Sequence, residues 1–519
     1  MRKPLSKRKT CLALTKAGRR RPVANAAPMH VALLLGVIVL SLMLATPPGR
    51  AQKPEITDEE ITNAIESELW TDDAVNPNTV DVSTKQGIVT FTGTADSVLA
   101  KDRAAAIAET TVGVRGVVNR IEVAPRIERT DKELQNAVTD ALLADPATDA
   151  YEIDASVAAG VVTLTGAVDS WAEKDLCSVV AKGVRGVKDV NNELDVDYKV
   201  TRSDYDIQEE IEARLANDVR IDDNLITVEV EDGEVRLSGT AGSLAEKRRA
   251  RTDAWVAGVT SVDADALDIE WWARDDMRRK SAYTARSDDE IEQAVKDAFL
   301  YDPRVYSFEP DVEVTGGTVA LRGTVDNLRA KRAAEQDARN VVGVWRVKNN
   351  LKVRPKVVPP DEELETRVAD ALSESPYINR YDVDVDVSSG WATLSGNVNT
   401  SFEAQEAERV AEGVKGVVRV FNNLDYEREW VWKPDWEIKA DIEDQLFWSP
   451  FVDSDEISVK VDGGIVTLTG TVDTWAERQD AEENAYDGGA KHVNNNLVVA
   501  HKWYGPRGAY SPYGWPYAY

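Results

Sequence analysis

The sequence predicts an α+β protein built from six small tandem domains, each with a three-stranded mixed sheet and two helices on one of its faces. A short run of alternating apolar residues between two glycines occurs six times, with successive closing glycines 73, 73, 84, 73 and 74 residues apart. An amphipathic helical pattern precedes each run, and a second helical pattern follows it. The closing glycines, which we interpret as structural positions, are Gly93, Gly166, Gly239, Gly323, Gly396 and Gly470.

The first helix of each unit carries apolar residues at positions i, i+4 and i+8, a stripe that suits packing on a sheet. In the first unit these are Ile61, Ile65 and Leu69. Four of the six helices begin with a Ser or Thr whose hydroxyl can accept from the backbone N–H three residues on, and in three of them a Glu can bond back. The four pairs are Thr57/Glu60, Thr130/Glu133, Ser203/Asp206 and Ser287/Glu290.

Two alternating runs joined by a short turn ending in Gly come next, which indicates a β-hairpin. The second helix has Ala at two positions four residues apart, so it can approach its neighbour closely. In the second unit Cys177 replaces the first Ala, and we expect a small buried residue there, not a reactive thiol. Each unit ends in Gly-Val-x-x-Val-x-Asn-x-Leu or a variant, which predicts a helix stop and a third strand.

The element order in each unit is therefore helix, strand, strand, helix, strand. The crossover through the second helix makes strand three parallel to strand two and places both helices on one face. A domain this small buries only about 60% of its unfolded surface, so we expect each to fold alone but to gain stability from its neighbours. The predicted domains are residues 57–125, 130–198, 203–270, 287–355, 360–427 and 434–500.

This combination of a helix, a hairpin with Gly-x-Val-x-Leu-x-Gly, an Ala-rich helix and the Asn-containing ending resembles the BON domain, the bacterial osmotic-stress and nodulation domain. The resemblance covers nearly all of residues 57–500. It implies an exported, non-enzymatic protein of the bacterial cell envelope, similar to osmotically inducible periplasmic proteins. It also implies binding to phospholipid surfaces or client proteins, and it supplies no catalytic motif.

Residues 1–51 are predicted to be a secretory signal peptide or an N-terminal anchor. They hold ten Lys and Arg and no Asp or Glu, and the apolar run from Val31 to Ala45 leads to small residues at Gly49 and Ala51. This run spans about 22 Å as a helix against about 30 Å of hydrocarbon, which favours cleavage. The protein is then periplasmic; if the segment is retained, the chain is anchored in the inner membrane and faces the periplasm.

The rest of the chain is strongly acidic. Without the ten basic residues of the N-terminal segment, 52 Lys and Arg face 91 Asp and Glu, a net charge of −39. This charge argues against nucleic acid as a partner, because such binding depends on neutralising phosphates. It also argues against general adhesion to anionic lipid, and it is typical of a solvated surface that keeps a long chain soluble.

Residues 271–286, between the third and fourth units, form a basic and aromatic linker that is a candidate contact with a membrane or a partner. Basic residues near anionic lipid contribute about 1 kcal/mol each, and Trp suits the interface. The alternative, which burial favours, is that the tryptophans pack on flanking domains while the arginines pair with acids. The candidate residues are Trp271, Trp272, Arg274, Arg278, Arg279 and Lys280.

No enzymatic, metal or cofactor site is predicted. The three histidines, His30, His492 and His501, are too few for a catalytic set repeated across the domains. The paired glycines flank strands and do not open helices, so they form no phosphate-binding loop. Acids alternate along one strand but lack the spacing of a calcium loop. These acids are Asp382, Asp384 and Asp386.

Two functions remain open. One is an exported multivalent binding protein, in which weak contacts of single domains become firm when several engage one phospholipid surface or unfolded envelope protein. Such a protein would act in osmotic or envelope stress protection. The alternative is an architectural spacer or scaffold in the envelope without affinity for lipid or client. Residues 501–519, rich in Gly, Pro and aromatic residues, are predicted to be a disordered tail.

Overall fold

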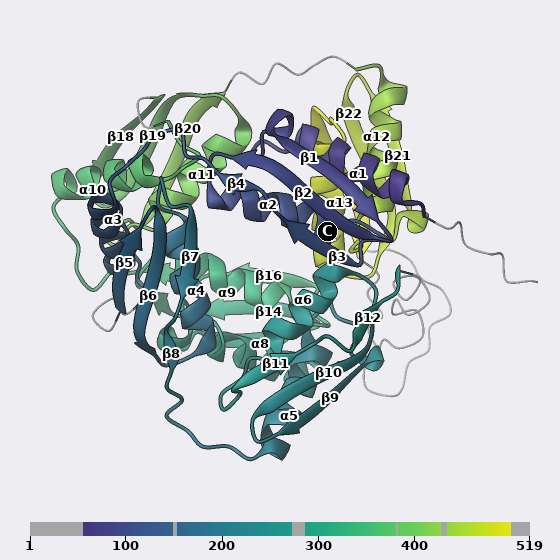
Figure 1. Ribbon diagram of the computed structural model, residues 1–519, viewed down its shortest axis with the longest axis horizontal. Helices are drawn as coiled ribbons and strands as arrows, with labels where there is room; N and C mark the ends of the chain where they lie inside the picture. Colours follow the sequence, from purple (N-terminus) through teal and green to yellow (C-terminus); the bar gives the residue numbers. More distant parts are fainter. Residues whose placement is uncertain (1–55, 149–152, 272–285, 380–381, 427–432, 500–519) are drawn as a thin grey trace, which may run out of the picture. The chain divides into compact units, whose positions relative to one another are not determined.

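The computed structural model describes residues 56–148, 153–271, 286–379, 382–426 and 433–499. The predicted signal segment and the predicted tail lie outside these ranges. Within them the chain forms six domains that repeat the predicted order of elements (Figure 1).

The first three domains have the following elements. The first contains α1 (Asp58–Thr71), β1 (Val80–Lys85), β2 (Ile88–Ala95), α2 (Val98–Glu109), β3 (Gly116–Asn119) and β4 (Glu122–Val123). The second contains α3 (Asp131–Ala144), β5 (Ile153–Ala158), β6 (Val161–Val168), α4 (Trp171–Lys182), β7 (Asp189–Asn192) and β8 (Asp195–Val196). The third contains α5 (Asp204–Asn217), β9 (Ile226–Glu231), β10 (Glu234–Ala241), α6 (Leu244–Asp253), β11 (Ser261–Asp263) and β12 (Leu267–Ile269).

The last three domains follow the same plan. The fourth contains α8 (Asp288–Leu300), β13 (Asp311–Thr315), β14 (Thr318–Arg322), β15 (Thr324–Val325), α9 (Leu328–Arg339), β16 (Arg346–Asn349) and β17 (Lys352–Val353). The fifth contains α10 (Asp361–Glu374), β18 (Val383–Ser388), β19 (Trp391–Val398), α11 (Ser401–Glu412) and β20 (Arg419–Tyr426). The sixth contains α12 (Asp435–Trp448), β21 (Ile457–Asp462), β22 (Ile465–Val472), α13 (Trp475–Asp487) and β23 (His492–Val499).

The second strand of each domain is the centre of its sheet. In the first domain β2 pairs antiparallel with β1 and parallel with β3 and β4. The parallel pairing follows from the crossover through α2. In the fifth and sixth domains the third strand is unbroken and pairs along the full central strand. The predicted α+β class and mixed sheet are confirmed.

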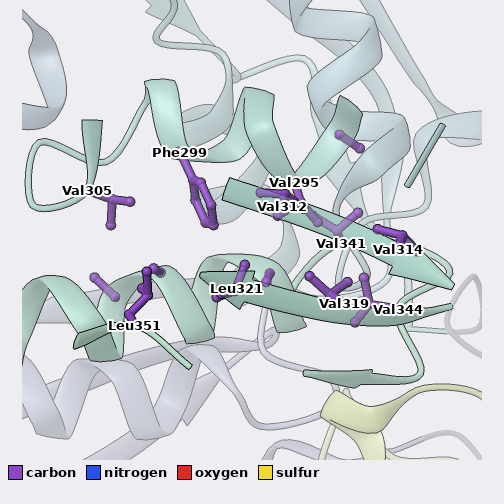
Figure 2. Packing of buried hydrophobic residues seen from close by; sticks show 14 of the residues in the cluster. Val295, Phe299, Val305, Val312, Val314, Val319, Leu321, Val341, Val344 and Leu351 are labelled. Atoms are coloured by element: carbon purple, nitrogen blue, oxygen red, sulfur yellow. The ribbon is translucent and has the colours of Figure 1, made fainter. Parts of the chain in front are cut away.

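Both helices of a domain pack on the same face of its sheet. Figure 2 shows this core in the fourth domain, where Val295 and Phe299 of α8 pack with Val312, Val319 and Leu321 of the hairpin. The predicted apolar stripes are buried in all six first helices. The small residues predicted on the second helices are all 0% exposed, because the helix backbone lies close to the sheet. They are Ala104, Ala108, Cys177, Ala181, Ala250, Ala254, Ala334, Ala338, Ala407, Ala411, Ala481 and Ala485.

The predicted capping interactions are present. Thr57, Thr130 and Ser287 form complete capping boxes with the Glu three residues on. Ser203 accepts from the backbone N–H of Asp206, whose shorter side chain contacts the Ser203 hydroxyl. The start of α5 in the third domain is therefore half a capping box, as the sequence predicted.

An aspartate at the start of each first helix holds the hairpin turn of its domain. In the first domain Asp58 accepts hydrogen bonds from the backbone N–H groups of Gln86 and Gly87, each 2.8 Å long. These hydrogen bonds lower the pKa of the Asp58 carboxyl. Sequence reasoning missed this contact, although an Asp stands 35 residues before every closing glycine. The six residues are Asp58, Asp131, Asp204, Asp288, Asp361 and Asp435.

The closing glycine lies where the hairpin crowds the central strand. In the fifth domain a Cβ on Gly396 would lie 2.2 Å from the carbonyl oxygen of Asp382, and the φ of Gly396 is +126°. In the fourth domain the nearest atom to a Cβ on Gly323 would be 3.9 Å away, although its φ is +116°. The central strand of the fourth domain is interrupted at this glycine, between β14 and β15.

Domains contact each other through equivalent positions, and two of the three pairs are far apart in the sequence. The described residues belong to one compact unit. In three domain pairs, a backbone N–H in the loop after a second helix donates to a carbonyl at the end of another domain's first helix. The three pairs are domains one and six, two and five, and three and four, and the gain in stability from neighbouring domains stays a prediction. These hydrogen bonds join Val112 to Trp448, Arg185 to Glu374 and Val342 to Asn217.

Candidate binding surfaces

The predicted linker contact falls almost entirely outside the described residues. Trp271 is the last residue before a gap and is half-buried. Its predicted partners in the contact lie beyond the described range, so the membrane contact and the alternative of inter-domain packing both stay predictions. These residues are Trp272, Arg274, Arg278, Arg279 and Lys280.

An open cavity of about 640 Å³ lies among first and second helices of several domains and is lined by charged, aromatic and aliphatic side chains. Arg249 on α6 pairs with Asp218 at 2.6 Å, and Arg214 on α5 pairs with Asp253 at 3.3 Å. Burial, reinforced by the charge of Asp218, raises the pKa of Asp253 to about 7. These arginines are held by the protein's own carboxylates, so we interpret the cavity as a charged packing region between domains.

The described residues show no metal or membrane-spanning feature. No group of three or more His, Cys, Asp or Glu in the described ranges could hold a metal ion. None of the described helices is long and apolar enough to cross a membrane. Cys177 is buried, and this burial, with the charges of Glu173 and Asp145, raises the pKa of its thiol to about 12. The expectation of a small buried residue at this position is confirmed.

The face of each sheet that turns away from the helices offers a surface for contact. At the first position of the central strand, Ile88 is 46% exposed, Trp391 is 47% exposed and Ile465 is 44% exposed. These three residues occupy the same place in the first, fifth and sixth domains. Large apolar side chains in such positions are available to a partner. One fold thus presents several similar faces.

The fifth domain adds aromatic and cationic character to this face. The rings of Trp391 and Phe421 meet edge to face, with 5.6 Å between their centroids. The guanidinium of Arg419 lies 4.6 Å from the centroid of the Phe421 ring and 5.6 Å from that of Trp391. The strand register places Trp391 opposite Arg419. Sequence reasoning noted neither contact, because the two strands are joined only through the helix crossover.

The family model of the BON domain matches residues 57–125, 130–198, 203–270, 287–355, 360–428 and 434–501. This chain belongs to the BON-domain family. The resemblance inferred from the repeat is therefore confirmed.

Two characterised relatives are similar to part of this BON-domain chain. It is 30% identical over 143 residues to "Osmotically-inducible protein Y" of Escherichia coli, a match that covers 26% of this chain and 71% of that protein. It is 36% identical over 116 residues to "Outer membrane lipoprotein DolP" of Haemophilus influenzae, which covers 21% of this chain and 60% of that protein. Each match spans only a fraction of the six BON domains.

Among solved structures, one similar chain is the C-terminal domain of CdsD, described as the structural protein of the type III secretion system of Chlamydia trachomatis. It is 17% identical, and the match covers 40% of this chain and 94% of that chain with a TM-score of 0.12. A TM-score this low carries no argument about the function of the BON-domain chain.

Proposed function

We propose that this protein is an exported, multivalent binding protein of the bacterial cell envelope whose BON domains attach it to phospholipid surfaces. The observation that supports this most directly is the repetition of one domain six times, with apolar side chains exposed on equivalent sheet faces. Several weak contacts to one surface give firm attachment, because each contact after the first forms at high effective concentration.

The relatives support the envelope as the place of action. One is named for osmotic induction and the other is an outer membrane lipoprotein. On the basis of these names, we propose a role in osmotic or envelope stress. We also propose that the protein is periplasmic after removal of residues 1–51. We propose no catalytic activity, since the chemistry offered at the described faces is charge and aromatic contact.

Unfolded envelope proteins are a second candidate ligand. The exposed Trp391 and its edge-to-face partner Phe421 form an aromatic cluster that suits apolar segments of a client. A pure spacer is less well supported, because contacts between domains one and six, or two and five, are not needed to set a distance.

Co-sedimentation of the purified chain with vesicles tests the lipid proposal. The protein is expected to sediment with vesicles containing phosphatidylglycerol at low salt. Failure to bind such vesicles removes phospholipid as the ligand. A parallel assay of whether the chain suppresses aggregation of a reduced model protein then decides for or against the client alternative.

Fractionation of cells with N-terminal sequencing tests the location. Recovery in the periplasmic fraction with Gln52 as the first residue is the expected result. Recovery of the uncleaved chain in the cytoplasm contradicts the export proposal.

A further inference from the structure

The third strand of the fourth domain and the segment after it carry a row of exposed cations. We call the set formed by Arg346, Lys348, Lys352, Arg354 and Lys356 the cationic strand; all five are exposed. The second domain has an acid at three of these five places. These acids are Asp189, Asp195 and Asp197. The cations are therefore not a requirement of the fold, since both domains adopt it.

The strand geometry directs these side chains away from the domain core. Leu351 is buried, Val353 packs against the core, and Asn349 donates to a backbone carbonyl of α9. Alternate residues of a strand point to opposite faces, so the intervening cations lie on the outer face. The register sets Lys348 opposite Ala320 of the central strand, whose short side chain leaves the ammonium group uncovered.

The cations are not neutralised within the described part of the chain, where none of the five forms an ion pair. The equivalents of Lys356 are neutralised in two other domains, where Arg126 pairs with Asp96 at 3.0 Å and Lys199 pairs with Asp169 at 2.7 Å. In the fourth domain the matching acid instead accepts a hydrogen bond from its neighbour's amide. The charge of the cationic strand is therefore available to a partner.

Apolar side chains lie exposed at both ends of the cationic strand. Trp345, just before it, is 39% exposed, and Val357 and Val358, just after it, are 76% and 59% exposed. An alternative is that cations at a sheet edge only prevent the edge from pairing with a strand of another protein. That role does not require exposed apolar residues beside the cations. Cations flanked by Trp and Val match a bilayer interface, where the charges meet headgroups and the apolar groups reach the acyl boundary.

We propose that the cationic strand docks this protein onto an anionic phospholipid bilayer through its fourth domain. This proposal rests on the proposed binding to phospholipid. It adds that the lipid surface must be anionic and that the fourth domain contacts it. The chain that remains after removal of residues 1–51 has a net charge of −39 and is repelled by an anionic surface as a whole, so a local patch of unpaired cations fixes which face approaches. The alternative partner is the acidic surface of a second copy of this chain. We favour the bilayer because the exposed apolar residues at both ends of the cationic strand suit its acyl boundary.

The test compares the full chain with the double variant Lys348→Gln/Lys352→Gln on vesicles of equal parts phosphatidylcholine and phosphatidylglycerol. A basic residue near an anionic surface strengthens binding about fivefold, so losing two should weaken vesicle binding about 25-fold. The matched control is Lys132→Gln/Lys439→Gln, which removes two exposed lysines from helices α3 and α12, away from the outer sheet faces, and is expected to change binding less than about twofold. Circular dichroism checks that all variants are folded.

The possible results distinguish failure of the proposed site, the cationic strand, from failure of the proposed binding to phospholipid. Equal binding by the wild type and both variants overturns the cationic strand and leaves the phospholipid function standing. Failure of the wild type to bind these vesicles overturns both. Unchanged vesicle binding, together with loss of self-association in the strand variant by analytical ultracentrifugation, overturns the bilayer as partner in favour of a second copy.

Discussion

The second and fourth domains have similar apolar cores, but the outer faces of their sheets carry opposite charges at several equivalent positions. On the inner face of the central strand, Leu164 and Leu321 are both 0% exposed and occupy equivalent places. On the outer face, Asp189 of the second domain stands where Arg346 stands in the fourth. The inner positions must fit between two helices and a sheet, whereas the outer ones meet solvent. Duplication of this domain therefore preserves the fold while its contact chemistry can diverge.

The largest expected effect tests the shared interior. Leu164→Ala and Leu321→Ala each remove a fully buried side chain from a small core, and each should destabilise its own domain by about 2 to 5 kcal/mol. Hydrogen exchange followed by mass spectrometry measures the opening free energy of β5–β8 and of β13–β17 separately. A large loss in one domain with none in the other contradicts the view that the interiors are equivalent.

A medium effect is expected at the aspartates that hold the hairpin turns. Asp131 and Asp288 each accept two backbone hydrogen bonds from their turn. Replacing either by Asn weakens hydrogen bonds to a charged group, and the expected loss is about 2 kcal/mol in either domain. Thermal unfolding and exchange of the turn amides measure it.

The neighbouring exposed Asp289→Asn is the control for the fourth domain, and little change is expected there. If Asp289→Asn destabilises as much as Asp288→Asn, the turn contact is not the cause.

The smallest effect concerns a buried acid that distinguishes the two domains. Asp337 on α9 stands where the second domain has Val180, and burial, then the charge of Asp302, raises its pKa well above the usual value of 3.8. The folded state therefore holds a proton that the unfolded state has released. Stability contributed by this group is present at low pH and is lost as pH rises from 3.8 through the raised pKa.

Asp337→Asn should accordingly raise the midpoint of thermal unfolding at pH 8, with a difference from wild type that shrinks towards pH 4. Arg304 and Arg249, which face Asp337, keep their ion pairs with Asp302 and Asp218 in the variant. The exposed Asp311→Asn is the control. The prediction is contradicted if the difference in unfolding midpoint between Asp337→Asn and wild type is less favourable to the variant at pH 8 than at pH 4.

Much of the fold could be predicted because its signals are local and repeated six times. The stripe Ile61, Ile65 and Leu69 recurs in every copy, and a helix with one apolar stripe can bury it only against the sheet. The aspartate that holds the turn was just as regular, but its partner is a backbone N–H group about 28 residues away, which leaves no mark in residue type.

The candidate surfaces were less predictable. Sequence reasoning selected the linker at Trp271, where aromatic and basic residues are adjacent in the chain. It did not single out Arg346 and Lys348, which the sequence gives no reason to set apart from other charged residues on strands. Only the structure shows that Lys199 pairs with Asp169 and that Lys348 forms no ion pair with another described residue.

The sequence by itself determined the domain, its six copies and the direction in which each side chain faces, since helix and strand periodicity are properties of the local backbone. The tertiary structure decided which charges remain unpaired and which distant domains touch, as Val112 does with Trp448. Ion pairing and contact between domains depend on distances across space, and these are set by how the six copies pack together.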